Sequence, residues 1–283
     1  MNRKTYLKIA LPVFLLFSGY MLYANSLNKP KHFYPDYPKK ELAALLSSPT
    51  PDAHTTSIIY RQTGLSPASQ KKLWNYPNRN FILYQCQNNF FADVSLEYCE
   101  NYFLTDTEKI NTSSDIPAFR LMDVQDGDIL ISFSSHTAGY IHGHAGIVTD
   151  ASKEEVLEAI TPGNYSNFCL LSHWYNYSTC IQLRLKDADS STKKEIASYA
   201  RQYLYQRPYN LGTGLFSHKS VDYTNEKNAG TQCAHLVWSA FAAFGYDIDA
   251  DGGKLVTVPD IAHSPLLEVV QLYGINPDEY PLK

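Results

Sequence analysis

An α+β fold is what the sequence predicts, and three observations support it. Segments of β-type come first in the C-terminal half and two amphipathic helices follow them, without the regular alternation of a doubly wound α/β fold. The composition is globular, with 44% hydrophobic and 13% aromatic residues in a chain of 283. The region from residue 119 onward holds about 165 residues, which is enough to bury one hydrophobic core.

The N-terminus has the pattern of an export signal. Arg3, Lys4 and Lys8 lead into an apolar run over residues 9–24, and no acidic residue occurs among the first 24. Pro12 and Gly19 interrupt the run, which falls short of the roughly 20 apolar residues that an unaided spanning helix prefers. We therefore expect residues 1–24 to be a signal peptide or an N-terminal anchor. The protein is then exported to the periplasm or cell envelope, and any membrane association goes through this segment.

Residues 25–118 are predicted to be a linker and an accessory region, because five prolines cluster between residues 30 and 51. Within this region a helix is expected to begin at Ser66 and Pro67, since serine is a frequent N-cap and proline suits the first helical position. Residues 119–283 are predicted to form the principal domain.

The principal domain contains the strand and helix patterns. Strands are predicted over residues 127–133, 145–149, 156–160 and 180–185. A helix capped by Thr192 is predicted from Lys193 to about residue 206, because its apolar residues recur at three- and four-residue steps. A second helix is predicted from about Gln232 to Phe244, with Gly245 as its C-cap.

The net charge of the chain limits the classes of partner that it can bind. The chain carries 24 Lys and Arg against 28 Asp and Glu, a formal net charge of -4. Electrostatic binding to the phosphates of a nucleic acid needs a basic surface. We therefore expect no nucleic-acid partner.

Five cysteines are an odd number for an exported protein. Cys86 and Cys99 are 13 residues apart and Cys169 and Cys180 are 11 apart, and both intervals suit a local disulfide. This pairing leaves Cys233 as a free, reactive thiol. Spacing alone does not fix connectivity, so five reduced and buried cysteines remain the alternative.

Cys233 is also the candidate nucleophile, because it lies at the start of a predicted helix, where free backbone N–H groups and the helix dipole favour a thiolate. His144 heads a predicted strand and can accept the thiol proton. Glu158 lies on the next strand and can orient the imidazole if the two strands form a hairpin around residues 150–154. His142 is a rival for the place of the base.

Six short segments in one order resemble the circularly permuted, papain-like NlpC superfamily of the YiiX/YaeF type. They are residues 127–130 (Gly-Asp-Ile-Leu), 144–148 (His-Ala-Gly-Ile-Val), 158–159 (Glu-Ala), 207–210 (Arg-Pro-Tyr-Asn), 233–238 (Cys-Ala-His-Leu-Val-Trp) and 256–265 (Val-Thr-Val-Pro-Asp-Ile-Ala-His-Ser-Pro). The histidine precedes the cysteine, which is the reverse of the order in ordinary papain-like enzymes. The resemblance covers a little over half of the chain, and the region before residue 119 departs from a minimal member.

The resemblance implies a papain-like core in which a small antiparallel β-barrel packs on the helix that carries the cysteine. It implies a hydrolase with Cys233 as nucleophile, His144 as base and Glu158 as orienting residue. Substrate contacts are assigned to Tyr209, which is also a possible oxyanion contact, and further to Gln232 and His142. The expected substrate is an amide bond in peptidoglycan peptides or another envelope component, and no cofactor is expected.

A second family keeps another substrate class open. Residues 232–237, Gln-Cys-Ala-His-Leu-Val, are similar to a stretch of the lecithin:retinol acyltransferase-like proteins. That similarity implies lipid-directed acyl transfer or deacylation through the same thioester chemistry. A third alternative is an envelope binding module that keeps the fold without catalysis.

Metal sites are not expected. His136, His142, His144 and His235 could bind zinc in principle, but most His-x-His pairs on strands are surface residues. Residues 247–252, Asp-x-Asp-x-Asp-Gly, imitate the start of a calcium-binding EF loop. Val258 occupies the twelfth position, where such a loop needs a bidentate glutamate.

Overall fold

The computed structural model describes residues 12–20, 23, 31–45, 51–102, 105–111, 117–137, 139–226 and 228–282. Residues 12–20 are helical and expose large apolar side chains, Phe14 and Leu16 among them. The rest of the predicted export segment, apart from Tyr23, lies outside the described residues. No described helix combines the length and the apolar character that crossing a bilayer requires.

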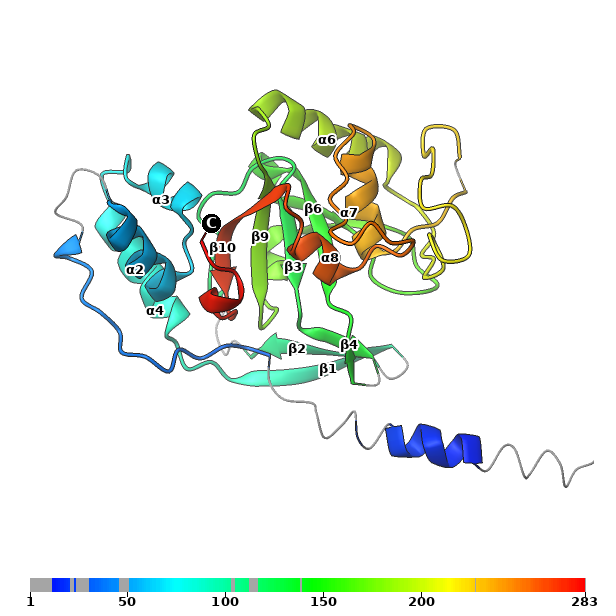
Figure 1. Ribbon diagram of the computed structural model, residues 1–283, viewed down its shortest axis with the longest axis horizontal. Helices are drawn as coiled ribbons and strands as arrows, with labels where there is room; N and C mark the ends of the chain where they lie inside the picture. The colour runs from blue at the N-terminus through cyan, green and yellow to red at the C-terminus, as the bar shows by residue number, and fades with distance from the viewer. Residues whose placement is uncertain are drawn as a thin grey trace, which may run out of the picture.

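Two antiparallel sheets organise the molecule (Figure 1). The larger has six strands in the order β10-β9-β3-β6-β7-β8, and the smaller has four in the order β1-β2-β4-β5. The strands of the larger sheet are β3 (Ile129–Ser132), β6 (His144–Asp150), β7 (Glu155–Glu158), β8 (Asn167–Leu170), β9 (Cys180–Leu185) and β10 (Leu267–Tyr273). Those of the smaller sheet are β1 (Leu96–Tyr102), β2 (Thr105–Ile110), β4 (Ser135–Thr137) and β5 (Tyr140–Ile141).

Strands β6 and β7 form the hairpin that the sequence predicts. The 3-10 turn Ala151–Lys153 joins them, and the Asp150 side chain caps this turn. Glu154 then adopts a left-handed conformation, with φ of 54°. The register places Gly146 opposite Glu158, so the end of β7 lies beside the beginning of β6.

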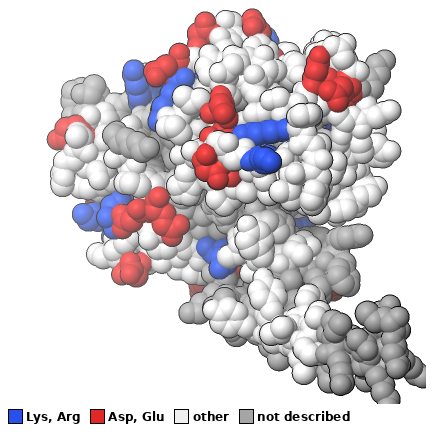
Figure 2. All heavy atoms as spheres, turned by 45° about the vertical axis from the view of Figure 1, so that its right-hand side comes forward, with Lys and Arg blue, Asp and Glu red and all other residues white. Residues whose placement is uncertain are grey.

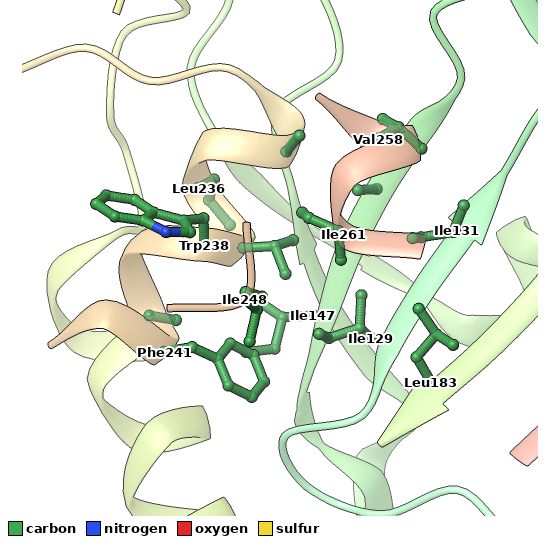
Figure 3. Packing of buried hydrophobic residues seen from close by; sticks show 14 of the residues in the cluster. Ile129, Ile131, Ile147, Leu183, Leu236, Trp238, Phe241, Ile248, Val258 and Ile261 are labelled. Atoms are coloured by element: carbon green, nitrogen blue, oxygen red, sulfur yellow. The ribbon is translucent and has the colours of Figure 1, made fainter. Parts of the chain in front are cut away.

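Helices α6 (Ser190–Tyr203) and α7 (Cys233–Ala242) cover one face of the larger sheet (Figure 1). Figure 3 shows Leu236 and Phe241 of α7 facing Ile129 and Ile147 of the strands, with Ile248 between them. Burying a side chain of this size contributes about 1.5–3 kcal/mol. The short helix α8 (Val258–Ala262) extends the same cluster.

The opposite face of the sheet packs against aromatic residues. Trp174 lies in α5 (Leu171–Trp174) and is fully buried, together with Phe119, Leu130 and Val148. Two clusters therefore sandwich the strands, and the N-terminal end of β6 lies where both meet.

The described part of the predicted accessory region holds three helices and the strands β1 and β2, and it contacts the larger sheet directly. Its helices are α2 (Ala53–Thr63), α3 (Pro67–Leu73) and α4 (Arg79–Phe90). Leu65 forms a β-bridge with Gln271, and the Ser66 N–H donates to the Val270 carbonyl (3.1 Å). This stretch covers the outer edge of β10. The division of the chain at residue 118 remains a prediction.

The helix starts mostly follow the sequence, with one correction. Helix α3 begins at Pro67 with Ser66 as N-cap, although the serine side chain makes no capping hydrogen bond. Helix α6 begins three residues earlier than predicted, because Asp189 and not Thr192 is its cap and accepts a hydrogen bond from the Thr192 N–H (2.7 Å). A carboxylate competes better than a hydroxyl for this position, since it also complements the helix dipole.

The predicted barrel is not closed in the described part of the chain. Strands β8 and β10 are the two outer strands of the six-stranded sheet and do not pair with each other. The edge of β10 is already occupied by residues 64–66, and β8 runs directly into α5. The structure is thus α+β with open antiparallel sheets.

The predicted disulfides are wrong, because all five cysteines are free thiols. Cys86 lies in α4 and packs among the helices, whereas Cys99 lies in β1. Cys169 in β8 and Cys180 in β9 are separated by three strands of the sheet. A disulfide needs Cα atoms within about 7 Å, and strands are spaced by about 4.8 Å. Cys233 is free, but the pairing argument that singled it out does not hold.

On the face shown in Figure 2, Lys and Arg side chains are interspersed with Asp and Glu, and most of the surface is uncharged. This face presents no continuous basic area of the kind that binds phosphate backbones.

Candidate active site

Helix α7 begins at Cys233 because Gln232 caps it. The Gln232 Oε1 atom accepts a hydrogen bond from the Ala234 N–H (2.8 Å), and Nε2 donates to the Val256 carbonyl (2.7 Å). Cys233 is therefore the first helical residue, and its own N–H has no acceptor within the helix. The thiol lies at the positive end of the helix dipole.

His144 is placed by a tight turn before β6. Gly143 has φ of +69°, and a Cβ atom added there would lie 2.8 Å from the Ser132 carbonyl oxygen and 3.0 Å from Val258. Only glycine fits this position without strain. The turn brings His144 opposite Ser132 of β3 and close to the start of α7.

Glu158 binds His144 from the neighbouring strand. Its Oε2 atom lies 2.8 Å from His144 Nε2, and both side chains are buried. Cys233 lies close enough to His144 to raise the pKa of the imidazole, while its thiol donates to Gln232 Oε1 (3.5 Å). Because Nε2 is engaged by the carboxylate, Nδ1 is the nitrogen available to the sulfur. The structure thus brings Cys233 beside the hydrogen-bonded pair of His144 and Glu158.

The charges of His144 and Glu158 stabilise each other. Burial by itself lowers the pKa of His144, but its contacts with Cys233 and Glu158 outweigh burial and raise the pKa to about 10. Burial by itself raises the pKa of Glu158, and the contact with His144 outweighs it, so the pKa lies below its usual value. The geometry favours an imidazolium on His144 beside the carboxylate of Glu158.

Aromatic rings enclose the pair. Trp174 stacks on His144, with ring centroids 5.2 Å apart and an interplanar angle of 14°, and the Tyr177 ring lies 6.1 Å away. Both rings are buried. They keep water from the histidine and carboxylate, which strengthens their electrostatic interaction.

Sequence reasoning missed the place of Cys169, which it had assigned to a disulfide. The Cys169 thiol lies close to the Glu158 carboxylate, and burial together with that carboxylate raises the pKa of the thiol, so it stays protonated. The register of β7 and β8 places Cys169 opposite Val156, two residues from Glu158 on the same face. That period of two would have indicated the contact once the hairpin partner of β7 was known.

The predicted substrate-contact residues have different surroundings. Tyr209 is half-buried and forms a β-bridge with Thr231, and Cys233 is close enough to add to the effect of burial in raising the pKa of its hydroxyl. Gln232 uses both ends of its carboxamide inside the protein, as described above. His142 is tied to Thr137 Oγ1 (3.0 Å) and to the Gly143 carbonyl (2.8 Å). Of these residues, Tyr209 has the position expected of a substrate contact.

His142 and His235 do not take the place of the base. His142 makes the bonds just given, whereas His144 holds Glu158. His235 is fully buried, binds the Lys219 carbonyl through Nε2 (2.8 Å) and lies 3.0 Å from Thr231 Oγ1 through Nδ1. Burial lowers the pKa of His235 to about 4, so it is neutral and structural.

Comparison with known proteins gives one relative and one solved structure. No protein family model matches the chain. The chain is 24% identical over 230 residues to the uncharacterized protein YycO of Bacillus subtilis strain 168, which covers 80% of this chain and 82% of that protein. The crystal structure of metalloprotein yiiX from Escherichia coli O157:H7 is similar with a TM-score of 0.38 and 15% identity, over 52% of this chain and 96% of that chain.

Proposed function

We propose that this protein is an exported cysteine hydrolase that cleaves an amide bond, with peptidoglycan peptides as the leading substrate. The observation that carries the proposal is the hydrogen-bonded pair of His144 and Glu158 beside Cys233, which lies at a helix N-terminus. A thiol, an imidazole and a carboxylate in this order are the elements of nucleophilic acyl transfer.

The reaction follows from these positions. The Cys233 sulfur attacks the carbonyl carbon, and the Cys233 N–H at the start of α7 stabilises the oxyanion that forms. The carbon–nitrogen bond breaks as the imidazolium of His144 gives its proton to the leaving amine, which leaves a thioester on Cys233. Water then attacks the thioester while His144 takes up its proton, and the carboxylic acid is released with the thiol restored. Glu158 keeps the imidazole in the required orientation throughout.

Alkylation by iodoacetamide, followed for each cysteine by mass spectrometry, tests the proposal without a substrate. Cys99 is a partly exposed thiol in β1 and serves as an internal reference. We expect Cys233 to react faster than Cys99 below pH 8, and we expect His144→Ala to abolish the difference. Equal rates in the wild-type protein would favour a binding module that keeps the fold without catalysis.

A second candidate is lipid-directed thioesterase or acyltransferase activity. It is favoured by the segment that follows Tyr209, where Leu211, Leu215 and Phe216 are exposed and Phe216 reaches 88% exposure. Exposed apolar residues suit contact with an acyl chain. Incubation with a labelled acyl lipid and with cell-wall peptides separates the two: an acyl group retained on Cys233 supports the lipid substrate, and release of new amines supports the amide substrate.

A further inference from the structure

The loop between α7 and α8 gathers three carboxylates at one point. One oxygen each of Asp249, Asp251 and Asp260 lies within 4.8 Å of the other two. In the part of the chain that the structure describes, this is the group of acidic, histidine or cysteine residues that could hold a metal ion. Asp251 is exposed and Asp260 is half-buried, so the group opens to solvent on one side.

A second observation is that Asp249 is incompletely satisfied. Its side chain is fully buried, and its Oδ2 atom pairs with the Lys219 ammonium. Its Oδ1 atom is buried and accepts no hydrogen bond from any described residue. Leaving a buried acceptor unpaired costs about 1–3 kcal/mol, and more when the group is charged, so native structures seldom keep one without a ligand or water.

The local charge is also unbalanced. Three carboxylates meet at this point, and the Lys219 ammonium pairs with that of Asp249. Lys219 offsets one of the three negative charges. Two of the three negative charges in the group therefore remain unbalanced.

We propose that Asp249, Asp251 and Asp260 bind one divalent cation, and that the ion is Ca²⁺. The donors are all oxygen atoms, which both Ca²⁺ and Mg²⁺ accept, but an irregular loop with an exposed side suits the larger and more flexible coordination of Ca²⁺. Lys219 keeps its contact with Oδ2 of Asp249 and orients the carboxylate, while Oδ1 faces the ion.

The carboxylate group does not follow the calcium-loop pattern in the sequence, which is why that pattern did not predict a site here. Asp247 opens the Asp-x-Asp-x-Asp-Gly pattern, yet its Oδ1 atom accepts a hydrogen bond from Trp238 Nε1 (2.7 Å) and it is not part of the group. Val258 occupies the twelfth position of the pattern, and its side chain offers no ligand atom. Asp260, two residues later in α8, supplies the third carboxylate of the group instead.

The site lies next to the element that holds the candidate nucleophile. Its ligands flank Val256, whose carbonyl accepts the hydrogen bond from Gln232, the cap of α7. Ile248 and Val258, which precede and follow this loop in the sequence, are both buried in the core cluster. A bound ion would join Asp249 and Asp251 to Asp260 across Val256 and so fix the loop that supports the start of α7.

Thermal unfolding of the full chain with CaCl₂, with MgCl₂ and with EDTA tests the inference, together with terbium luminescence excited through the adjacent Trp238. We expect Ca²⁺ at a hundred times its Kd to raise Tm by about 5 °C, and Ca²⁺ to displace Tb³⁺. The Asp251→Asn variant should fold, because the side chain is exposed, and should lose both effects. Asp187→Asn is the matched control, since Asp187 is exposed and outside the group.

An unchanged Tm with Ca²⁺ and no sensitised terbium emission would overturn the inference and would mean that Lys219 alone neutralises the loop. Equal responses of Asp251→Asn and Asp187→Asn would also overturn it. A larger effect of Mg²⁺ than of Ca²⁺ would overturn the identity of the ion. None of these readouts depends on hydrolase activity, so they are independent of the proposed function.

Discussion

Two buried charged groups on the six-stranded sheet differ in how fully their hydrogen bonds are used. Arg184 donates from Nε to Asp128, from Nη1 to Asp123 and from Nη2 to both residues, at 2.7–2.8 Å. His144 binds Glu158 through one nitrogen and turns the other toward Cys233. All the polar atoms named in the first group are engaged, whereas the second group ends at the Cys233 thiol. The difference teaches that saturation of a buried ion group marks a structural role and an available end marks a chemical one.

The largest expected effect is on activity, and it distinguishes the His144 group from the Arg184 group. His144→Ala should lower turnover of an amide substrate by about 10⁴-fold, because the general acid and base is lost. This corresponds to about 5.5 kcal/mol of transition-state free energy. Steady-state kinetics measures the loss, and circular dichroism should show a folded variant. A variant with more than a tenth of wild-type activity would contradict the assignment of His144.

The next effect separates the groups by stability. Arg184→Met should lower the free energy of unfolding by about 3–5 kcal/mol, because the buried carboxylates of Asp123 and Asp128 lose their partner. Urea unfolding measures this change. The alkylation rate of Cys233 in the folded fraction should stay within about twofold of wild type, since the contacts of His144 are intact. A large change in the alkylation rate would mean that the Arg184 group and the His144 group are coupled.

Glu158→Gln should have a smaller effect on activity than the loss of His144. Glutamine can keep a hydrogen bond to Nε2 but not the negative charge, so we expect a loss of turnover of about 10–100-fold. Cys169→Ser keeps a polar group close to the carboxylate and should retain activity, whereas Cys169→Ala removes that group. An effect of Glu158→Gln equal to that of His144→Ala would give Glu158 a larger role than orientation.

The pH dependence of stability should also distinguish the active-site group. The pKa of His144 in the folded protein, about 10, lies above its unfolded value. Its contribution to stability is therefore fully present below about pH 6.5 and is lost as pH rises toward 10. Urea unfolding of the wild type and of His144→Gln, from pH 6 to pH 9.5, should show their difference in stability shrinking. A constant difference would mean that the histidine is neutral in the fold.

The smallest effect is expected at the N-cap of α6. Asp189→Ala should cost about 1 kcal/mol of stability, because the first turn of α6 loses its side-chain acceptor. Thermal unfolding measures this cost. The reactivity of Cys233 should not change, and a change would mean that α6 is coupled to the start of α7.

Local patterns were sufficient to predict the central strands and both long helices. The hairpin of β6 and β7 followed from a turn between two apolar runs, and it led directly to Glu158. Cys233 at the first position of α7 followed from the apolar pattern beginning just after it. These features depend on residues close together in the sequence, where propensity and periodicity operate.

Pairing across the chain could not be predicted. The separation of Cys169 from Cys180 depends on strand order, and the spacing of two cysteines carries no information about the three strands between them. The carboxylate group at Asp249 was rejected because Asp260 lies outside the span of the sequence pattern. The cover over β10 was missed for the same reason, since residues 64–66 have no local signal for pairing.

That cover has a consequence for biosynthesis. Strand β10 is the last described strand to leave the ribosome, and it must meet a segment made long before, as the Ser69 contact with Val270 spans 201 residues. Until it arrives, β9 lacks a neighbour on one side and residues 64–66 lack their partner. An unpaired, apolar strand edge recruits other chains, and contacts of such separation form slowly. The newly made polypeptide therefore passes through a stage in which a holding chaperone would protect it, and that stage ends when residues 267–273 close the sheet.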